Sequence, residues 1–330
     1  MEALLNPYYL QIAMFMLINA ILGISIYLTL STGQLSLGNA GFMSIGAYTS
    51  ALLSLKAGLP IFLAIPAGGI AACLLAAVIG IPTTRLQGIY LAIATLGFGE
   101  VVRVIILNMK ITNGALGLSG IPSLSISIGK LLAAAGLGQG ILGLTLQQVS
   151  NLAVILLLAL LVVFLVFFSL RLRSSRIGRA FAAIKEDEHA AEVTGVNTVY
   201  YKLLAFFLGA FVAGIAGGLA AHLTFYIGPK DFSYHRAVEI LLFAVFGGSN
   251  VVWGPLLGAV ILTSLPEVLR SVAEYREMIY GAILVVMMIF RPQGLIGEDT
   301  IRFWRSKMTW LRVRPGNTEA SRRPADDAEA

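Results

Sequence analysis

The amino-acid sequence predicts an all-α fold, a polytopic transmembrane helical bundle of about nine spans with glycine-broken helices in both halves. Of its 330 residues, 58% are apolar and 12% are charged, whereas soluble domains are close to half apolar and a quarter charged. The run from Leu152 to Phe168 holds 17 apolar residues without a break, which reaches the lower length limit for a helix that crosses the ~30 Å hydrocarbon core. Long apolar runs recur along the chain, and burial in lipid explains them together.

Apolar runs and the residues that break them give the order of the elements. We expect spans at residues 8–30, 34–54, 60–81, 88–108, 150–168, 204–224, 238–253, 255–270 and 278–291. The seventh and eighth are shorter than a typical span of ~20 residues. These spans make up a transmembrane domain over residues 1–303, followed by a cytoplasmic tail at 304–330 whose polar end is expected to be disordered.

The distribution of basic residues predicts the orientation of the chain. Of 23 Lys and Arg residues, six lie in 171–202 and eight in 291–330, and basic clusters beside spans mark the cytoplasmic side. The loop at 169–203 and the C-terminus are therefore expected inside, and the N-terminus outside. The Gly/Ser-rich segment at 109–148 should face outward. These clusters account for the net charge of +6, so we predict no nucleic-acid partner.

Several kinds of site are excluded by the sequence. Cys73 is the only cysteine and lies in an apolar run, so no disulfide can form within the chain. Residues 1–9 contain no Lys or Arg and thus lack the basic region of a cleavable signal. We find no GxxxxGK[ST] phosphate loop, no cluster with metal-ligand spacing and no Ser/His/Asp or Cys/His set. We therefore predict no catalytic residues, no metal and no cofactor.

The segment at 31–48, STGQLSLGNAGFMSIGAY, is a poor spanning helix because it contains four glycines and several polar residues. Polar, glycine-interrupted segments are tolerated at membrane depth when they are buried in protein or line water, and transporters build their pathways from them. Close packing of helices through small residues is the alternative. Under the pathway interpretation the candidate lining residues are Gln34, Ser36, Asn39 and Gly41.

A second glycine-rich segment, GGSNVVWGPLLGA at 247–259, lies in the other half of the chain. Asn250 to Gly258 has nearly the spacing of Asn39 to Gly46, which is a weak indication of an internal repeat. Asn250 is accordingly the fifth candidate for the translocation pathway.

Two pairs of ionisable residues are predicted in or beside spans. Glu100 precedes Arg103 by three residues, and Arg236 precedes Glu239 by the same interval, so each pair shares one face of a helix. Local ion pairing is one interpretation of Glu100, and a role in binding substrate or a coupling ion is the other.

The cytoplasmic loop is predicted to form a helix, a turn and a second helix. Ala180, Phe181 and Ile184 make one apolar stripe, and the acidic residues 186–188 suit the start of the second helix, where anions oppose the helix dipole. Gly195 suits its C-terminus. Such a pair either docks on a protein partner or is a solvated connector.

Taken in order, STGQLSLGNAGFMSIGAYTSALL, TNGALGLSGIP (112–122), the basic loop, FGGSNVVWGPLLGAVIL and RPQGL (291–295) resemble the LivM-type permeases, which are membrane subunits of branched-chain amino acid ABC importers. The resemblance runs from about residue 8 to 297. It implies a bacterial inner-membrane, multi-pass permease surrounded by lipid. The implied partners are a second related permease, two cytoplasmic ATPase subunits and a periplasmic substrate-binding protein.

The resemblance also implies which residues couple the permease to its ATPase. Importers of this kind carry an EAA-x-x-x-G motif in a cytoplasmic loop, and Ala190, Ala191 and Gly195 match its spacing. His189 stands where the motif has Glu, and Glu188 precedes it. These five residues are the candidate coupling site.

Three functions were weighed from the sequence. An ABC importer permease, for branched-chain amino acids or for urea, short amides or other amino acids, explains the missing phosphate loop and the helical cytoplasmic loop. A standalone secondary transporter would explain the glycine-broken segments equally well. A membrane-embedded enzyme has no catalytic set to support it.

Overall fold

The computed structural model describes residues 7–134 and 145–268, with isolated positions between 278 and 295. Within this part of the chain nearly all regular structure is helical. The one described sheet is a short antiparallel pair, in which β1 (Leu118–Ser119) aligns with β2 (Tyr226–Ile227).

Five described helices are long and apolar enough to cross a membrane. They are α1 (Pro7–Leu30), α3 (Ile61–Thr83), α4 (Gly88–Asn108), α6 (Leu146–Ser174) and α9 (Thr198–Thr224). They match the predicted spans at 8–30, 60–81, 88–108, 150–168 and 204–224, which confirms the all-α transmembrane bundle.

Three further helices fall where shorter or more polar spans were predicted. They are α2 (Asn39–Lys56), α10 (Tyr234–Gly247) and α11 (Trp253–Val268). Residues 31–38 are not helical, so the span predicted at 34–54 begins later than expected. More than half of the span predicted at 278–291 lies outside the described residues, and so does the whole of the tail at 304–330.

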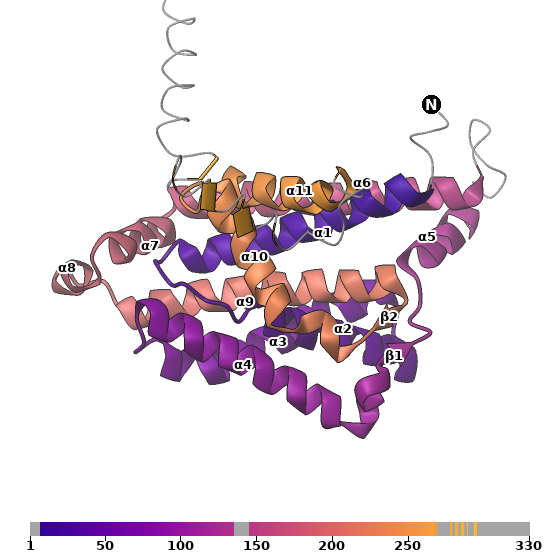
Figure 1. Cartoon of the computed structure of the whole chain (residues 1–330), viewed down its shortest axis with the longest axis horizontal. Coiled ribbons are helices and arrows are strands. Elements are labelled where there is room, and N and C mark those ends of the chain that lie inside the picture. The colour runs from indigo at the N-terminus through magenta and orange to yellow at the C-terminus, as the bar shows by residue number, and fades with distance from the viewer. Residues whose placement is uncertain are drawn as a thin grey trace, which may run out of the picture.

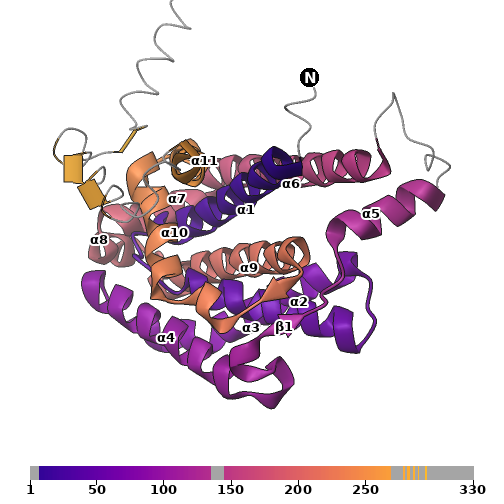
Figure 2. The same ribbon diagram turned by 45° about the vertical axis from the view of Figure 1, so that its right-hand side comes forward.

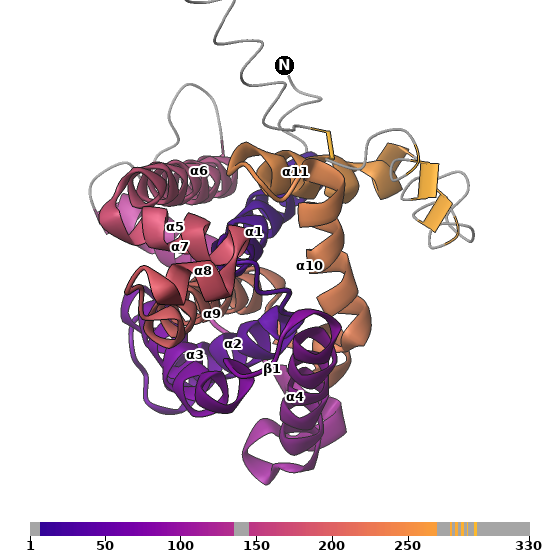
Figure 3. The ribbon, with the colours of Figure 1, turned by 90° about the vertical axis from the view of Figure 1, so that its left-hand side faces the viewer.

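The long helices lie roughly along one direction, and α9 runs through the middle of the bundle (Figure 1). Helix α9 packs against α1, α2 and α3, whereas α1 also packs against α6 and α11. Figure 3, which looks from the end that carries α7 and α8, shows α10 inclined across the bundle between α4 and α11.

The two ends of the bundle carry different elements. Helices α7 (Arg176–Glu186) and α8 (Glu188–Val193) lie at one end, and the β1–β2 pair and α5 (Leu124–Leu132) lie at the other (Figure 1). In Figure 2, α5 lies beside the first turns of α6, against which it packs. The loop at 169–203 and the segment at 109–148 are therefore on opposite ends, as the predicted topology requires.

Glycines allow α2, α3 and α9 to touch through their backbones. A Cβ added to Gly46 would lie 2.1 Å from the carbonyl oxygen of Gly214, and one added to Gly217 would lie 1.9 Å from that of Met43. A Cβ at Gly68 would lie 2.5 Å from the oxygen of Gly46. Any larger residue at these positions would push the helices apart, so glycine is required by packing here.

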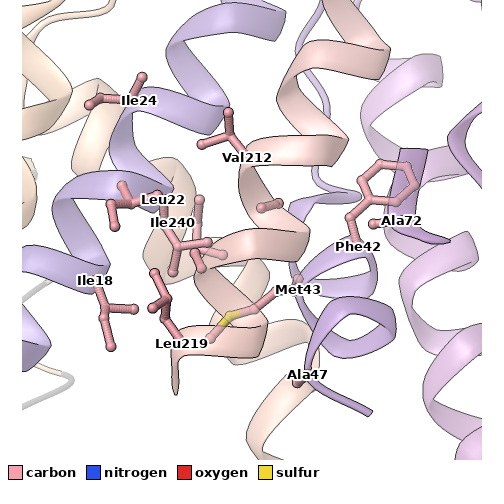
Figure 4. Close-up of a cluster of buried hydrophobic side chains, with 14 of the residues drawn as sticks. Ile18, Leu22, Ile24, Phe42, Met43, Ala47, Ala72, Val212, Leu219 and Ile240 are labelled. Atoms are coloured by element: carbon pink, nitrogen blue, oxygen red, sulfur yellow. The ribbon is translucent and has the colours of Figure 1, made fainter. Parts of the chain in front are cut away.

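The buried apolar side chains form one continuous cluster, to which α1, α2, α9 and α10 contribute together with the surrounding helices. Figure 4 shows Ile18, Leu22 and Ile24 of α1, with Leu22 beside Ile240 of α10. Ile18, Leu22, Ile24 and Ile240 are no more than 1% exposed.

Candidate translocation site

A cavity of about 620 Å³ lies between α1, α2, α9, α10, α11 and the turn η4 (Pro229–Phe232). It is lined by Ile12, Phe15, Ile18, Asn19, Met43, Ala220, Thr224, Tyr226, Ile227, Asp231, Phe232, Arg236, Glu239 and Thr263. Because β2 and η4 contribute to its wall, the cavity lies in the half of the bundle away from α7 and α8. Its lining divides into a polar part and an apolar part.

The polar part is a chain of hydrogen bonds that joins three helices. The Arg236 guanidinium on α10 donates to Glu239 Oε2 at 2.7 Å and to Asn19 Oδ1 on α1 at 2.6 Å. Asn19 Nδ2 in turn donates to Thr263 Oγ1 on α11 at 2.8 Å. The predicted pairing of Arg236 with Glu239 is thus confirmed, and it belongs to a larger network.

The second predicted pair is also formed, away from the cavity wall. Arg103 Nε donates to Glu100 Oε2 at 2.7 Å. The other oxygen of Glu100 accepts from the backbone N–H of Tyr234 at 3.0 Å. Because Tyr234 begins α10, Glu100 satisfies a backbone donor that the helix itself leaves unpaired.

The residues of the first glycine-rich segment are buried where α1 ends and α2 begins. Asn39 Nδ2 donates to Ser25 Oγ at 2.7 Å, and Ser25 Oγ donates to the Gly209 carbonyl of α9 at 2.8 Å. Asn39 Oδ1 and Gln34 Oε1 are buried without a hydrogen-bond partner among the described residues. Such orphaned acceptors call for water or a ligand.

Two other members of that segment have structural partners. Ser36 is fully buried, and its hydroxyl accepts from the backbone N–H of Gly38 at 3.2 Å. A Cβ added to Gly41 would lie 3.0 Å from Gly99 Cα on α4. Close helix packing therefore accounts for Gly41, and whether Ser36 lines a pathway stays a prediction.

Asn250 lies apart from these residues. It is exposed, it lines a separate cavity of about 240 Å³, and its Oδ1 accepts from Lys185 Nζ of α7 at 2.7 Å. A Cβ at Gly254 would lie 2.0 Å from the Gly248 oxygen. The glycines of this second segment thus bring α10 and α11 together, and the structure does not place Asn250 beside Asn39.

The loop at 169–203 has the predicted helix–turn–helix form. Phe181 and Ile184 of α7 are buried, and Phe181 packs edge-on against the Tyr201 ring of α9. Asp187 Oδ1 accepts from the first backbone N–H groups of α8, and Gly195 follows the helix with a positive φ of 87°. These are the N-cap and C′ roles expected from the sequence.

The five candidate coupling residues differ in exposure. His189, Ala190 and Gly195 are exposed, and Glu188 is half-buried. Ala191 is only 3% exposed, so it packs inside this chain and does not form part of an outer docking surface.

Glu188 ties α8 to the bundle. It accepts from Lys202 Nζ of α9 and from Gln87 Nε2, which precedes α4, the latter at 3.1 Å. Beside the exposed candidates, Val193 is 89% exposed and adds an apolar side chain to the outer surface of α8.

Sequence reasoning missed Asn19 and Thr263. Asn19 stands alone in an apolar run, and its partners Thr263 and Arg236 are both more than 200 residues away along the chain. The available signal was Asn19 itself, a single amide in the middle of an otherwise apolar span, because a polar group at that depth requires a partner.

Comparison with known proteins gives a consistent result. Residues 8–290 match the family described as branched-chain amino acid transport system / permease component. The chain is 37% identical over 282 residues to the high-affinity branched-chain amino acid transport system permease protein LivM of Escherichia coli K12, and 36% identical over 282 residues to LivM of Salmonella typhimurium LT2. Each alignment covers 83% of this chain and 66% of the relative.

A more distant relative covers about half of the chain. LivH of Escherichia coli K12, a permease protein of the same transport system, is 31% identical over 146 residues, which is 43% of this chain and 47% of LivH. No solved structure matches this chain. The match over residues 8–290 spans most of the sequence, and the chain therefore belongs to the family of branched-chain amino acid transport system permease components.

Proposed function

We propose that this chain is the transmembrane permease subunit of an ATP-driven importer of branched-chain amino acids in the bacterial inner membrane. The observation that carries the proposal is a cavity with both a charged and an apolar wall in a chain of this permease family. Branched-chain amino acids combine a charged backbone with an aliphatic side chain, and such a cavity suits both parts.

The proposed route runs from the cavity toward the α7 end of the bundle. Met43 lines the cavity. Asn39 lies about one helical turn before Met43, at the start of α2, and bonds Ser25 of α1. Gln34, Ser36 and Asn39 would frame the inner part of the route, where two amide oxygens have no partner among the described residues. Gly41 would set the spacing of the helices around it.

Asn250 would act nearer the cytoplasmic end. It lines the smaller cavity together with Ser31 and Lys185. In this proposal solute would pass Asn250 after the inner part of the route, so the two amides would act in succession.

The proposed partners are a second related permease, two ATPase subunits and a periplasmic binding protein. The likeness to both LivM and LivH supports a pair of related permeases. The sequence has no phosphate loop of its own, so ATP would be bound by another chain. Glu188, His189, Ala190 and Gly195 would couple the chains, with Val193 at the contact and Ala191 supporting α8 from within.

Reconstitution tests this proposal. The chain is expressed with the proteins encoded beside it, the complex is placed in liposomes, and uptake of radiolabelled leucine is measured with and without enclosed ATP. We expect uptake only with ATP and loaded binding protein. Leucine uptake driven by an ion gradient through this chain alone would refute an ATP-driven importer, and ATP-driven uptake of urea or acetamide instead of leucine would refute the substrate.

A further inference from the structure

The charged residues of the large cavity lie at its surface. The side chain of Arg236 is 18% exposed and that of Glu239 is 39% exposed, although both sit among helices of a membrane protein. A charge at this depth is costly unless it is paired or faces a water-filled cavity. Asn19, at 5% exposure, is the buried anchor that fixes the guanidinium at the cavity wall.

The charges of the wall are unequal. Arg236 supplies one positive charge, whereas Glu239 and Asp231 supply two negative charges. One oxygen of Asp231 accepts from the backbone N–H of Gly228 at 2.8 Å. A ligand with an ammonium and a carboxylate group would find a complement for each, because a guanidinium binds carboxylates through fixed paired donors.

The rest of the lining includes buried apolar side chains. Ile18, Met43 and Phe232 are no more than 5% exposed, and they belong to the buried cluster of the bundle. An aliphatic side chain could rest on this wall, whereas a charged one would lose its hydration without a partner. The volume of about 620 Å³ lies within the range of small-molecule sites.

We propose that this cavity is a transit site for an amino-acid zwitterion. Arg236 binds the α-carboxylate, Glu239 and Asp231 face the α-ammonium group, and Ile18, Met43 and Phe232 contact the aliphatic side chain. The inference rests on the proposed function and adds to it that the permease itself recognises the charged backbone of the solute. A neutral amide or urea offers neither charged group, so Arg236 would stay bonded to Glu239 and Asn19 alone.

The first experiment separates ligand binding from a purely structural tie. Asn19→Asp keeps the size of the side chain and places a carboxylate against Arg236. If the network only joins helices, this added ion pair leaves transport unchanged. If Arg236 binds solute, the new carboxylate competes for the guanidinium, and ATP-driven leucine uptake falls about tenfold or more, the loss expected for one charge-assisted hydrogen bond.

Arg236→Lys is the second variant. Lysine keeps the positive charge but lacks the planar guanidinium, whose several N–H donors can bond Glu239, Asn19 and a carboxylate at the same time. Arg103→Lys is its matched control. Arg103 pairs with Glu100, three residues away on its helix, at the same 2.7 Å distance as Arg236 with Glu239, but Arg103 does not line the cavity. We expect leucine uptake to fall for Arg236→Lys and to stay near the unmodified rate for Arg103→Lys.

A second experiment locates the solute without relying on transport rates. The purified complex is illuminated with photo-leucine, whose side chain carries a diazirine, and labelled peptides are identified by mass spectrometry. We expect labels at Ile18, Met43 or Phe232, with competition by leucine but not by leucinamide, which lacks the carboxylate. Asn19→Asp should abolish the labels while the complex keeps its size in gel filtration.

The outcomes distinguish this inference from the proposed function. If the complex imports leucine, yet Asn19→Asp and Arg236→Lys import normally and photo-leucine labels no cavity residue, the zwitterion site is wrong and the importer stands. If the unmodified complex imports no leucine, the proposed function itself fails. Labelling that leucinamide displaces as well as leucine does would overturn the role given to Arg236.

Discussion

The contact between Gly217 of α9 and Met43 of α2 can be tested by adding one methyl group. In Gly217→Ala the new Cβ would lie 1.9 Å from the Met43 carbonyl oxygen, so the helices must separate by about 1.5 Å to reach an ordinary contact of 3.4 Å. The Met43 oxygen belongs to the helix backbone and cannot rotate aside. Overpacking of this kind costs roughly 1–3 kcal/mol, and we expect the upper part of that range.

Gly97→Ala is the matched control. Gly97 is also a glycine inside a transmembrane helix, but nothing lies within 4 Å of its added Cβ. Because alanine favours helix over glycine by about 1 kcal/mol, this variant should be as stable as the unmodified protein or slightly more stable. The measurement is the temperature at which the detergent-solubilised chain loses its monodisperse gel-filtration peak. Equal temperatures for Gly217→Ala and Gly97→Ala would refute backbone contact between α2 and α9.

Four further substitutions test other parts of the structure. Val193→Asp places a charge on the outer face of α8 and should reduce the solute-stimulated ATPase activity of the complex; a normal ATPase response would contradict docking there. Ala191→Trp should instead destabilise the chain, because the Ala191 site is buried. Asn39→Leu should slow leucine uptake while assembly is kept, and unchanged uptake would favour a packing role. The His222 ring bonds the Ser50 hydroxyl at 2.9 Å and the Pro122 carbonyl at 2.8 Å. His222→Phe should lower the free energy of unfolding by about 1–3 kcal/mol, because it leaves these two groups without their partner. An unchanged free energy of unfolding would contradict these bonds.

Structural features that depend on residues close together in the sequence were predictable. The turn between α7 and α8 follows from Asp187, whose carboxylate caps α8, and from Gly195, whose positive φ ends it. The burial of Phe181 and Ile184 follows from their spacing on one helical face. These signals act over a few residues, so no knowledge of the tertiary structure is needed to interpret them.

Features that depend on which helices meet were not predictable. Similar spacing in the two glycine-rich segments suggested that Asn39 and Asn250 act alike, yet one bonds Ser25 and the other bonds Lys185 of α7. Spacing along a chain does not determine the neighbours of a side chain in space. The burial of Ala191 was missed because α8 has only six residues, which is too short for a periodic pattern to show its inner face.

Many of the glycine contacts fall within two bodies of packed helices, and Gly209 of α9 also meets α1 closely. One comprises α2, α3 and α9; the other comprises α10, α11 and α1, where a Cβ at Gly23 would lie 2.6 Å from the Pro255 oxygen. Backbone surfaces that meet without intervening side chains cannot slide or compress easily, so each body should move as a unit. The bond from Ser25 to the Gly209 carbonyl joins the two bodies near the α7 end. We therefore expect the two bodies to pivot there, and the large cavity, whose lining comes from both, to change its volume as they move.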